Sequence, residues 1–396
     1  MSKRYESRHA LVKRRKRRIF GPAFFSVLVF LVSGVLFALN DLNRAEIVDI
    51  SDLLEPNRPS FSPPQGEPNG PGDVFRGTGL NILVIGSDHR TAEQADAEEV
   101  VGMRGDTTML MHIAADRSRV EVVSIPRDTL VEIPKCKFFD GTSTDPQDGQ
   151  FNAAFAIGGQ NNNPAEAAAC TLVTVENMSD VLVNEWMVIE FDSFRTIVDS
   201  LGGIPMCFSE RLRDKRADLS IEPGCQRLNG TQALSYSRAR YALGDGSDLS
   251  RIGRQQQLVG AIAEQALSSN LLTDLPKLYN FLGASLEALT SSEIGELTRL
   301  AGLAQSLAGV DRDKIRFVTL PVELVEGGAR VVPTADAELV WDAIRADQPI
   351  PDFVGGTTAT GAPWPTGLAG ASQTPDDSAS PEGSAEEGTT EEGSGE

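Results

Sequence analysis

The sequence predicts an α/β (α+β) fold, with a central mixed β-sheet flanked by helices and preceded by one transmembrane helix. Three apolar runs, at 80–86, 108–113 and 120–125, have the composition of buried strands. Turn residues at 115–118 connect the second and third runs as an antiparallel hairpin. Strands interspersed with helices, together with a hairpin, favour a mixed sheet over a purely parallel one.

Helical periodicity covers most of the chain after the third strand. The expected helices are 151–180, 192–201, 229–242, 250–268, 290–308 and 335–346. An apolar run at 314–320 predicts one late strand between the last two helices. We therefore expect helices from the second half of the chain to cover the sheet.

Residues 19–39 form an uncharged apolar run that is long enough to cross a bilayer. The basic segment 1–18 directly before it predicts a cytoplasmic N-terminus, with the rest of the chain outside the cell. A cleaved signal peptide is the alternative, but the stretch from Phe37 to Asn40 is a poor cleavage site. We expect an uncleaved, single-pass anchor in the cell membrane.

Two further segments have the composition of connectors. Residues 40–75 are rich in Pro, Gly and Asn, which predicts a semi-extended linker outside the membrane. Residues 351–396 are dominated by Gly, Ser, Thr, Pro and Glu, which predicts a disordered acidic tail. The formal net charge of −20 disfavours nucleic acid as a partner.

Four cysteines, Cys136, Cys170, Cys207 and Cys225, fall on the predicted outer side. An even number outside the membrane favours disulfides over metal ligands. The chain has no C-x-x-C pair and its three histidines are scattered, so a zinc site is not expected. Three pairings are possible, and proximity in sequence favours Cys136–Cys170 and Cys207–Cys225.

Arginine and aspartate recur together at the ends of the apolar runs. The pairs are Asp88 with Arg90, Arg104 with Asp106, and Arg127 with Asp128. If the first and third strands run the same way and the second runs back, all three pairs fall at one edge of the sheet. Arginine binds phosphate, and aspartate holds the hard cation that accompanies it. The pattern indicates a phosphorylated or pyrophosphorylated substrate.

The second half of the chain adds further arginines. Arg251, Arg254 and Gln255 share one face of a predicted helix because they are spaced i, i+3 and i+4. The N-terminus of that helix also favours anions. Arg238 and Arg240 lie near the end of the predicted helix 229–242 and, being two residues apart, cannot both lie centrally on one helical face, but both reach the same site if that helix frays near Ser237.

These motifs, in their order and density between about residues 80 and 260, resemble the LytR–CpsA–Psr family. The matching stretches are Asn81–Asp88 with Arg90, Arg104–Thr107, Ser124–Asp128, Asn152–Gly159, Val198–Ile204, Leu228–Arg240 and Asp248–Gln255. The resemblance implies a catalytic domain at 76–262, and 263–350 would complete the extracellular domain. The loop at 91–103 departs from the family pattern because it is long and acidic.

The resemblance implies a membrane-anchored phosphotransferase that depends on Mg²⁺ (or Mn²⁺). Such an enzyme moves a glycopolymer from a polyprenyl-pyrophosphate carrier to peptidoglycan and leaves a phosphodiester. Arabinogalactan and teichoic acid are candidate polymers. By motif, Asp88 and Asp106 would hold the metal. The residues expected to bind pyrophosphate are Arg90, Arg127, Arg238, Arg240, Arg251, Arg254 and Gln255. The catalytic set would comprise Arg127, Asp128, Arg238, Arg240 and Arg251.

Attack on a pyrophosphate builds negative charge on phosphoryl oxygens, which arginines and a metal stabilise, so no protein nucleophile is required. The general base would be Asp88, Asp106 or Asp128. The sequence has neither a G-x-S-x-G elbow nor a Walker P-loop, which disfavours a serine hydrolase or an ATP-driven enzyme. Two alternatives stay open: a polyprenyl-pyrophosphate phosphatase or pyrophosphatase, and a non-catalytic envelope regulator or lipid-binding module.

A lipid-linked substrate also needs an apolar groove, expected between the sheet and the helices. The candidate lining residues are Phe155, Ile157, Val188, Ile189 and Phe191, and core packing is the alternative for each.

Overall fold

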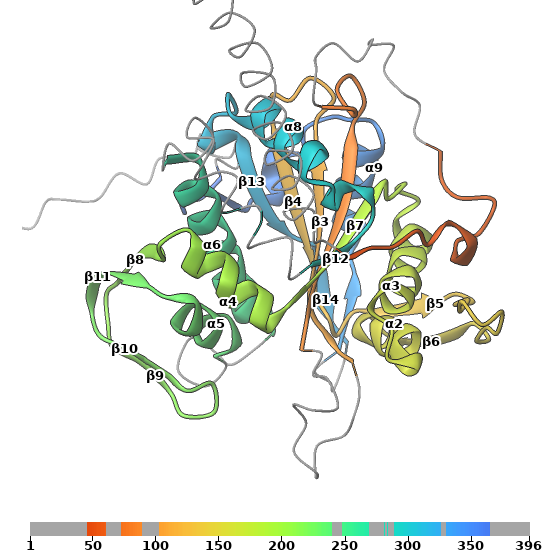
Figure 1. Cartoon of the computed structure of the whole chain (residues 1–396), viewed down its shortest axis with the longest axis horizontal. Helices are drawn as coiled ribbons and strands as arrows, with labels where there is room; N and C mark the ends of the chain where they lie inside the picture. The colour runs from red at the N-terminus through yellow and green to blue at the C-terminus, as the bar shows by residue number, and fades with distance from the viewer. Residues whose placement is uncertain are drawn as a thin grey trace, which may run out of the picture.

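The computed structural model describes residues 46–60, 73–88, 103–239, 248–268, 289–325 and 330–364, together with 281 and 283. These residues form a mixed β-sheet with helices on both faces (Figure 1). The strand order is β1 (Glu46–Ile47), β12 (Leu289–Ser291), β7 (Glu185–Glu190), β2 (Leu80–Ser87), β3 (Gly105–Ile113), β4 (Val120–Ile125), β13 (Ile315–Thr319) and β16 (Thr357–Thr358). The predicted α/β class, with a central mixed sheet flanked by helices, is confirmed.

The three strands predicted first lie side by side in the centre of this sheet. β2 is antiparallel to β3, and β3 is antiparallel to β4. Arg117, at φ 61°, lies in the tight turn between β3 and β4. Consequently β2 and β4 end at the edge where β3 begins, as the hairpin predicted.

One face of the sheet is covered by three helices, α2 (Phe151–Gly158), α3 (Pro164–Ser179) and α9 (Ala335–Arg345). Leu83 and Ile85 of β2 point into this layer and are fully buried there. Successive side chains of a strand point to opposite faces, so their neighbours are buried on the other side. This alternation explains why the strands read as continuous apolar runs.

The opposite face packs against α6 (Asp248–Ser268) and α8 (Leu297–Leu307). Ile82 and Met109 of the sheet share this layer with Leu303 of α8. Figure 1 shows the two helical layers on either side of the strands.

The predicted helix 151–180 is two helices. Asn163 accepts hydrogen bonds from the backbone N–H groups of Ala165 and Glu166, and Pro164 occupies the first turn, so a new helix begins there. Gly158 ends α2 close against α3, because a Cβ at this position would lie 2.6 Å from the Cβ of Cys170. The 3₁₀ turn η2 (Gly159–Asn161) connects the two helices.

The predicted helix 290–308 also differs at its start. Residues Leu289–Ser291 form β12, and the 3₁₀ turn η3 (Glu293–Gly295) precedes α8. β12 pairs with β7 on one side and β1 on the other. Tertiary pairing therefore overrides the helical periodicity of this segment.

A smaller layer packs beside α6. It contains α4 (Phe191–Ser200), α5 (Gly230–Arg238) and two hairpins. The hairpins pair β8 (Ile204–Phe208) with β11 (Gly224–Leu228), and β9 (Leu212–Asp214) with β10 (Leu219–Ile221). The α5 helix begins in a capping box, in which Asn229 and Gln232 exchange side-chain and backbone hydrogen bonds. The hairpins, α5 and α6 share one buried cluster.

The remaining short elements lie around this framework. They are η1 (Ser51–Leu53), η4 (Arg312–Lys314) and η5 (Asp352–Val354), with the paired strands β5 (Leu130–Ile133) and β6 (Gln147–Gln150), and β14 (Val322–Leu324) and β15 (Val331–Pro333).

The folded body extends beyond both boundaries expected from composition. Within the expected linker, β1 joins the sheet and Ile50 and Leu53 are buried in the core. Within the expected tail, β16 pairs with β13. A few apolar side chains suffice to fix such segments when a sheet edge is available.

Among the described residues, no helix has both the length and the apolar character needed to cross a membrane. The predicted anchor at 19–39 lies outside the described residues, as does the basic segment 1–18.

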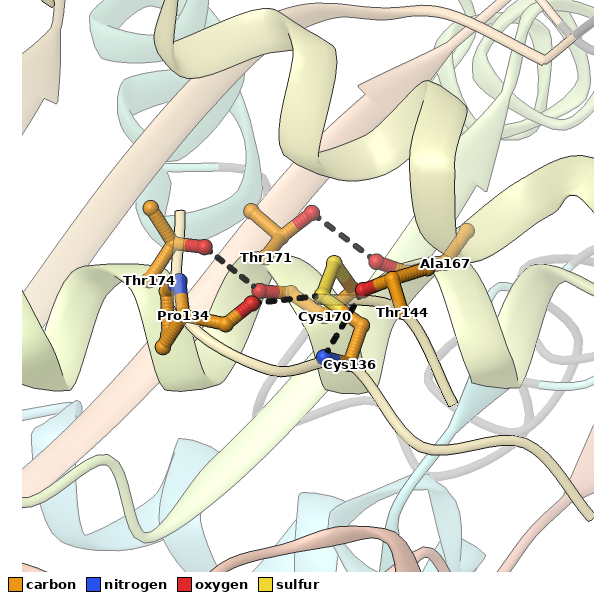
Figure 2. Close-up of a disulfide and its surroundings, with 7 residues drawn as sticks. All are labelled: Pro134, Cys136, Thr144, Ala167, Cys170, Thr171 and Thr174. Carbon is orange, nitrogen blue, oxygen red and sulfur yellow. Dashed lines mark hydrogen bonds between the residues drawn. A yellow bond between two sulfur atoms is a disulfide. The ribbon is translucent and has the colours of Figure 1, made fainter. Parts of the chain in front are cut away.

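Both predicted disulfides are present. Cys136–Cys170 joins the loop after β5 to α3, and Cys207–Cys225 links directly paired residues of β8 and β11. Figure 2 shows the first bridge, where Cys136 donates its backbone N–H to Thr144 and Thr174 donates its hydroxyl to the carbonyl of Cys170. The first bridge thus fastens a loop to a helix, and the second joins two neighbouring strands.

Candidate functional site

The charged motifs at the strand ends meet at one edge of the sheet. Ser87 of β2 pairs with Gly105 of β3 across a register shift, and Asp88 follows directly. The Asp88 carboxylate accepts a hydrogen bond of 3.0 Å from the backbone N–H of Arg104. The prediction that these strand ends converge is therefore confirmed by their pairing.

Asp88 and Asp106 lie close enough to repel each other. Burial raises the pKa of Asp88 above its usual value, and the negative charge of Asp106 raises it further. A divalent cation would relieve that repulsion. Two neighbouring carboxylates, one of them with a raised pKa, are thus a chemical basis for a cation site.

Arg127 lies beside this pair, at the end of β4. Its Nη1 is 3.3 Å from a carboxylate oxygen of Asp106, and its Nε is 3.5 Å from Asp128. Gln150 donates to the other oxygen of Asp128 at 2.9 Å. These contacts hold the guanidinium at the sheet edge between two carboxylates.

The arginine face of α6 approaches the same edge. Arg251 donates from Nη2 to the backbone carbonyl of Asp106 at 3.3 Å, so the helix is tied directly to β3. Arg251, Arg254 and Gln255 are all buried. Arg254 donates to the carbonyl of Ala239 at 2.6 Å, just beyond the end of α5.

Arg238 ends α5 and is exposed, with its guanidinium carbon 4.9 Å from the centre of the Phe191 ring. Phe191 begins α4 and was expected in the lipid groove. Of the other groove candidates, Phe155 and Val188 are buried in the core. Arg90 and Arg240 lie outside the described residues, so their predicted roles stay predictions.

A cavity of about 250 Å³ is lined by some of these groups, whereas Asp88, Arg127 and Arg254 are not among its lining residues. It is lined by Asp106 and Thr107 of β3, Phe191 of α4, Ser237 and Arg238 of α5, and Arg251 and Gln255 of α6. Its remaining wall is the turn of the β9–β10 hairpin, through Asp214, Arg216 and Ala217. No motif marked this hairpin in the sequence, because its position beside the site follows only from tertiary packing.

A larger hollow of about 580 Å³ lies elsewhere, between the segment 55–60 and the end of α3. Its arginines are engaged within the protein. Arg58 binds the Glu176 carboxylate and the Val183 carbonyl, and Arg345 pairs with Glu338 and Asp342. We therefore place the site at the smaller cavity, where the predicted residues converge.

Within the described part of the chain, no group of three His, Cys, Asp or Glu side chains is arranged to hold a metal ion. The Asp88 and Asp106 pair still fits Mg²⁺, which commonly takes one or two protein carboxylates and completes its shell with water and substrate phosphate. The arrangement can thus bind an anion with arginines on one side and a cation on the other.

Known proteins resemble this chain over most of its length. A model of the LytR_cpsA_psr family matches residues 66–345. The cell wall biosynthesis protein LcpA of Corynebacterium glutamicum is 28% identical over 325 residues, which cover 77% of this chain and 60% of LcpA. The chain therefore spans about three fifths of the length of this relative.

Two further matches come from other bacteria. The polyisoprenyl-teichoic acid–peptidoglycan teichoic acid transferase TagU of Halalkalibacterium halodurans is 28% identical, and the match covers 63% of this chain and 77% of TagU. The solved structure of a LytR-Csp2A-Psr enzyme from Actinomyces oris aligns with a TM-score of 0.52 at 20% identity, covering 76% of this chain and 96% of that one. That likeness concerns the fold. With the family model matching most of the chain, this protein belongs to the LytR–CpsA–Psr family.

Proposed function

We propose that this protein is a membrane-anchored phosphotransferase that moves a glycopolymer from a polyprenyl-pyrophosphate carrier to peptidoglycan. The observation that carries the proposal is that Arg127 and Arg251 contact Asp106 and that Arg238 lines the same cavity as Asp106, although the three arginines come from elements that are distant in sequence. TagU relatives, which are named for transfer of teichoic acid to peptidoglycan, support the same class of reaction.

The arginines account for substrate binding. A pyrophosphate diester carries two negative charges, and guanidinium groups bind phosphoryl oxygens through charge-assisted, often paired hydrogen bonds. Arg238 and Arg251 line the cavity, and Arg127 stands beside Asp106 at its edge. The same groups stabilise the charge that develops on the phosphoryl oxygens during transfer.

The reaction forms one bond and breaks one. An acceptor hydroxyl on peptidoglycan attacks the phosphorus that carries the glycan, and the bond from that phosphorus to the bridging oxygen breaks. Polyprenyl phosphate leaves with the electron pair, and the hydroxyl proton passes to a carboxylate of the site, Asp88, Asp106 or Asp128. The product is a phosphodiester between polymer and peptidoglycan, and no covalent intermediate with the protein is needed.

Asp88 and Asp106 would hold Mg²⁺ (or Mn²⁺), because their mutual repulsion favours a cation between them. When bound, the ion would neutralise charge on the phosphoryl oxygens. The raised pKa of Asp88 implies that protons compete with the metal at a higher pH than at an ordinary aspartate.

The lipid carrier requires that the site face a membrane. The apolar run 19–39 with its basic flank supports an anchor of this kind, with the domain on the outer side. An extracellular position also agrees with the two disulfides.

The test is transfer of a radiolabelled glycan from a synthetic polyprenyl-pyrophosphate donor to peptidoglycan by the full chain in detergent. Arg127→Ala and Arg238→Ala should each reduce transfer at least 100-fold, roughly the effect of losing one charge-stabilising group. EDTA should stop transfer, and added Mg²⁺ should restore it.

Arg312→Ala is the matched control, because Arg312 forms a half-exposed ion pair with Glu264 and does not line the cavity. It should keep wild-type activity. Full activity of both site variants would refute the assignment, and an unchanged rate in EDTA would remove the metal. Release of free glycan phosphate to water, without joined polymer, would instead indicate a phosphatase.

A further inference from the structure

The β9–β10 hairpin brings a third arginine into the cavity wall. Arg216 lies in the turn between Asp214 and Leu219 and lines the cavity with Arg238 and Arg251. We propose that Arg216 is a further substrate-binding residue that contacts the phosphoryl oxygens of the donor. The inference rests on the proposed function and adds to it a residue outside the motifs that define the family resemblance.

The turn is held in a fixed shape. Asp214 is 4% exposed, and its Oδ1 accepts the backbone N–H groups of Arg216 at 2.9 Å and Ala217 at 3.3 Å. Asp218 adopts φ 50°, which closes the turn. The backbone that carries Arg216 is therefore preorganised by a buried side chain.

The hairpin is also fixed relative to the other two arginines. Leu212, Ala217 and Leu219 are buried in the same cluster as Tyr236 of α5 and Leu258 of α6. The hairpin thus packs against the helices that carry Arg238 and Arg251. Arg216 can take part in binding without a rearrangement of the domain.

The charge of the residues that line the cavity favours a bound anion. Three guanidinium groups surround one cavity of about 250 Å³, in a chain whose formal net charge is −20. Two carboxylates, Asp106 and Asp214, share the lining, so arginines outnumber acidic side chains there by three to two. Bringing three positively charged side chains together costs electrostatic free energy, and a bound pyrophosphate would offset that cost.

The experiment measures binding to the full chain in detergent with Mg²⁺, by titration calorimetry. The two probes are farnesyl pyrophosphate, which lacks a glycan, and a synthetic polyprenyl-pyrophosphate disaccharide. Arg216→Gln should weaken the binding of both probes about tenfold or more, the effect of removing one charged hydrogen bond. Its unfolding should match the wild type, because Arg216 is exposed.

Arg213→Gln is the control, since Arg213 is exposed on the same hairpin, carries the same charge and does not line the cavity. It should change affinity less than about twofold. If the two variants bind the probes with equal affinity, the proposal for Arg216 is overturned. Binding of the probes by the wild type would in that case still support the proposed function. Weaker binding of the disaccharide probe alone would overturn it in favour of a sugar contact. A wild type that binds neither probe would overturn both proposals.

Discussion

Removing the Cys136–Cys170 disulfide should destabilise the domain mainly by increasing the conformational entropy of the unfolded chain. The bridge closes a loop with a sequence separation of 34 residues. Loop-closure entropy then gives about 3.8 kcal/mol for this bridge at 25 °C, and about 3.2 kcal/mol for Cys207–Cys225, whose separation is 18. The double variant Cys136→Ala/Cys170→Ala should lose roughly that free energy of unfolding.

The assay is urea unfolding of the variant, followed by fluorescence and circular dichroism. A loss of about 3.8 kcal/mol corresponds to a melting temperature lower by roughly 8 to 15 °C for a domain of this size. The slope m should increase, because the unfolded chain expands when the loop is opened. Cys207→Ala/Cys225→Ala is the matched comparison, since it removes a bridge between paired strands.

Two results would refute the reasoning. A loss below about 1 kcal/mol would mean that the reduced chain keeps the loop closed by residual structure. A loss of about 3.8 kcal/mol with an unchanged m would show that the bridge acts through packing in the folded state. Both sulfurs are buried there beside Ile133 and Ala154. Reduction of the Cys207→Ala/Cys225→Ala variant, whose remaining bridge is Cys136–Cys170, should lower its stability by the same amount, which separates the bridge from the cavity left by alanine.

Two further predictions concern packing and charge in the core. Both ring nitrogens of buried His112 face acceptors, Asn81 at 2.7 Å and Asp347 at 3.0 Å, and Asp347→Asn should cost about 2 to 3 kcal/mol at pH 7 by breaking this network. Burial is the largest single influence on the pKa of Asp347 and raises it, but the contacts with His112, the backbone N–H of Ala115 and the charge of Arg119 together outweigh burial, so the pKa is lowered. The stabilisation from Asp347 is therefore complete above the unfolded pKa near 4 and is lost as pH falls through the folded pKa. Chemical unfolding from pH 7 to 3 should show the deficit of the variant shrinking, and a constant deficit would contradict this. Gly158→Ala should destabilise by about 1 to 3 kcal/mol, because its Cβ would lie 2.6 Å from the Cβ of Cys170. At Gly253 in α6 an added Cβ would meet no neighbouring group within 4 Å, so Gly253→Ala should leave stability equal or raise it by up to about 1 kcal/mol. Equal changes in melting temperature for the two variants would show that the contact at Gly158 is not tight.

The sequence predicted the sheet centre well, because β2, β3 and β4 are buried on both faces and therefore read as continuous apolar runs. The break between α2 and α3 was also visible, since Asn163 and Pro164 form a standard helix start, but the apolar periodicity on both sides obscured it. β12 could not be predicted. Three residues carry no periodicity, and only β7 and β1 on either side define them as a strand.

The site likewise contains residues that the sequence predicted and one that it did not. The convergence of Asp88, Asp106 and Arg127 was predictable because all three lie near the ends of strands whose directions follow from one hairpin. Arg251 and Gln255 were predictable from their spacing on one helix. Arg216 was not, since its hairpin reaches the cavity only through packing on α5 and α6. Spacing along a chain reveals neighbours within an element, whereas contacts between elements depend on the fold.

The geometry of the site depends most on α6, because this helix is fixed on several sides. Val259 packs against the sheet layer, and Leu258 belongs to the cluster that holds the hairpins and α5. Gln256 donates to the hydroxyls of Ser124 and Thr319, which lie on neighbouring strands of the sheet. Rotation or sliding of α6 would break these contacts together, so the direction of its arginine face is set by the core. The Arg251 bond to the carbonyl of Asp106 then fixes the distance between helix and sheet edge. The proposed pyrophosphate site, although assembled from distant segments, can therefore be rigid before the substrate arrives, which is the condition under which charged groups stabilise a transition state without reorganising.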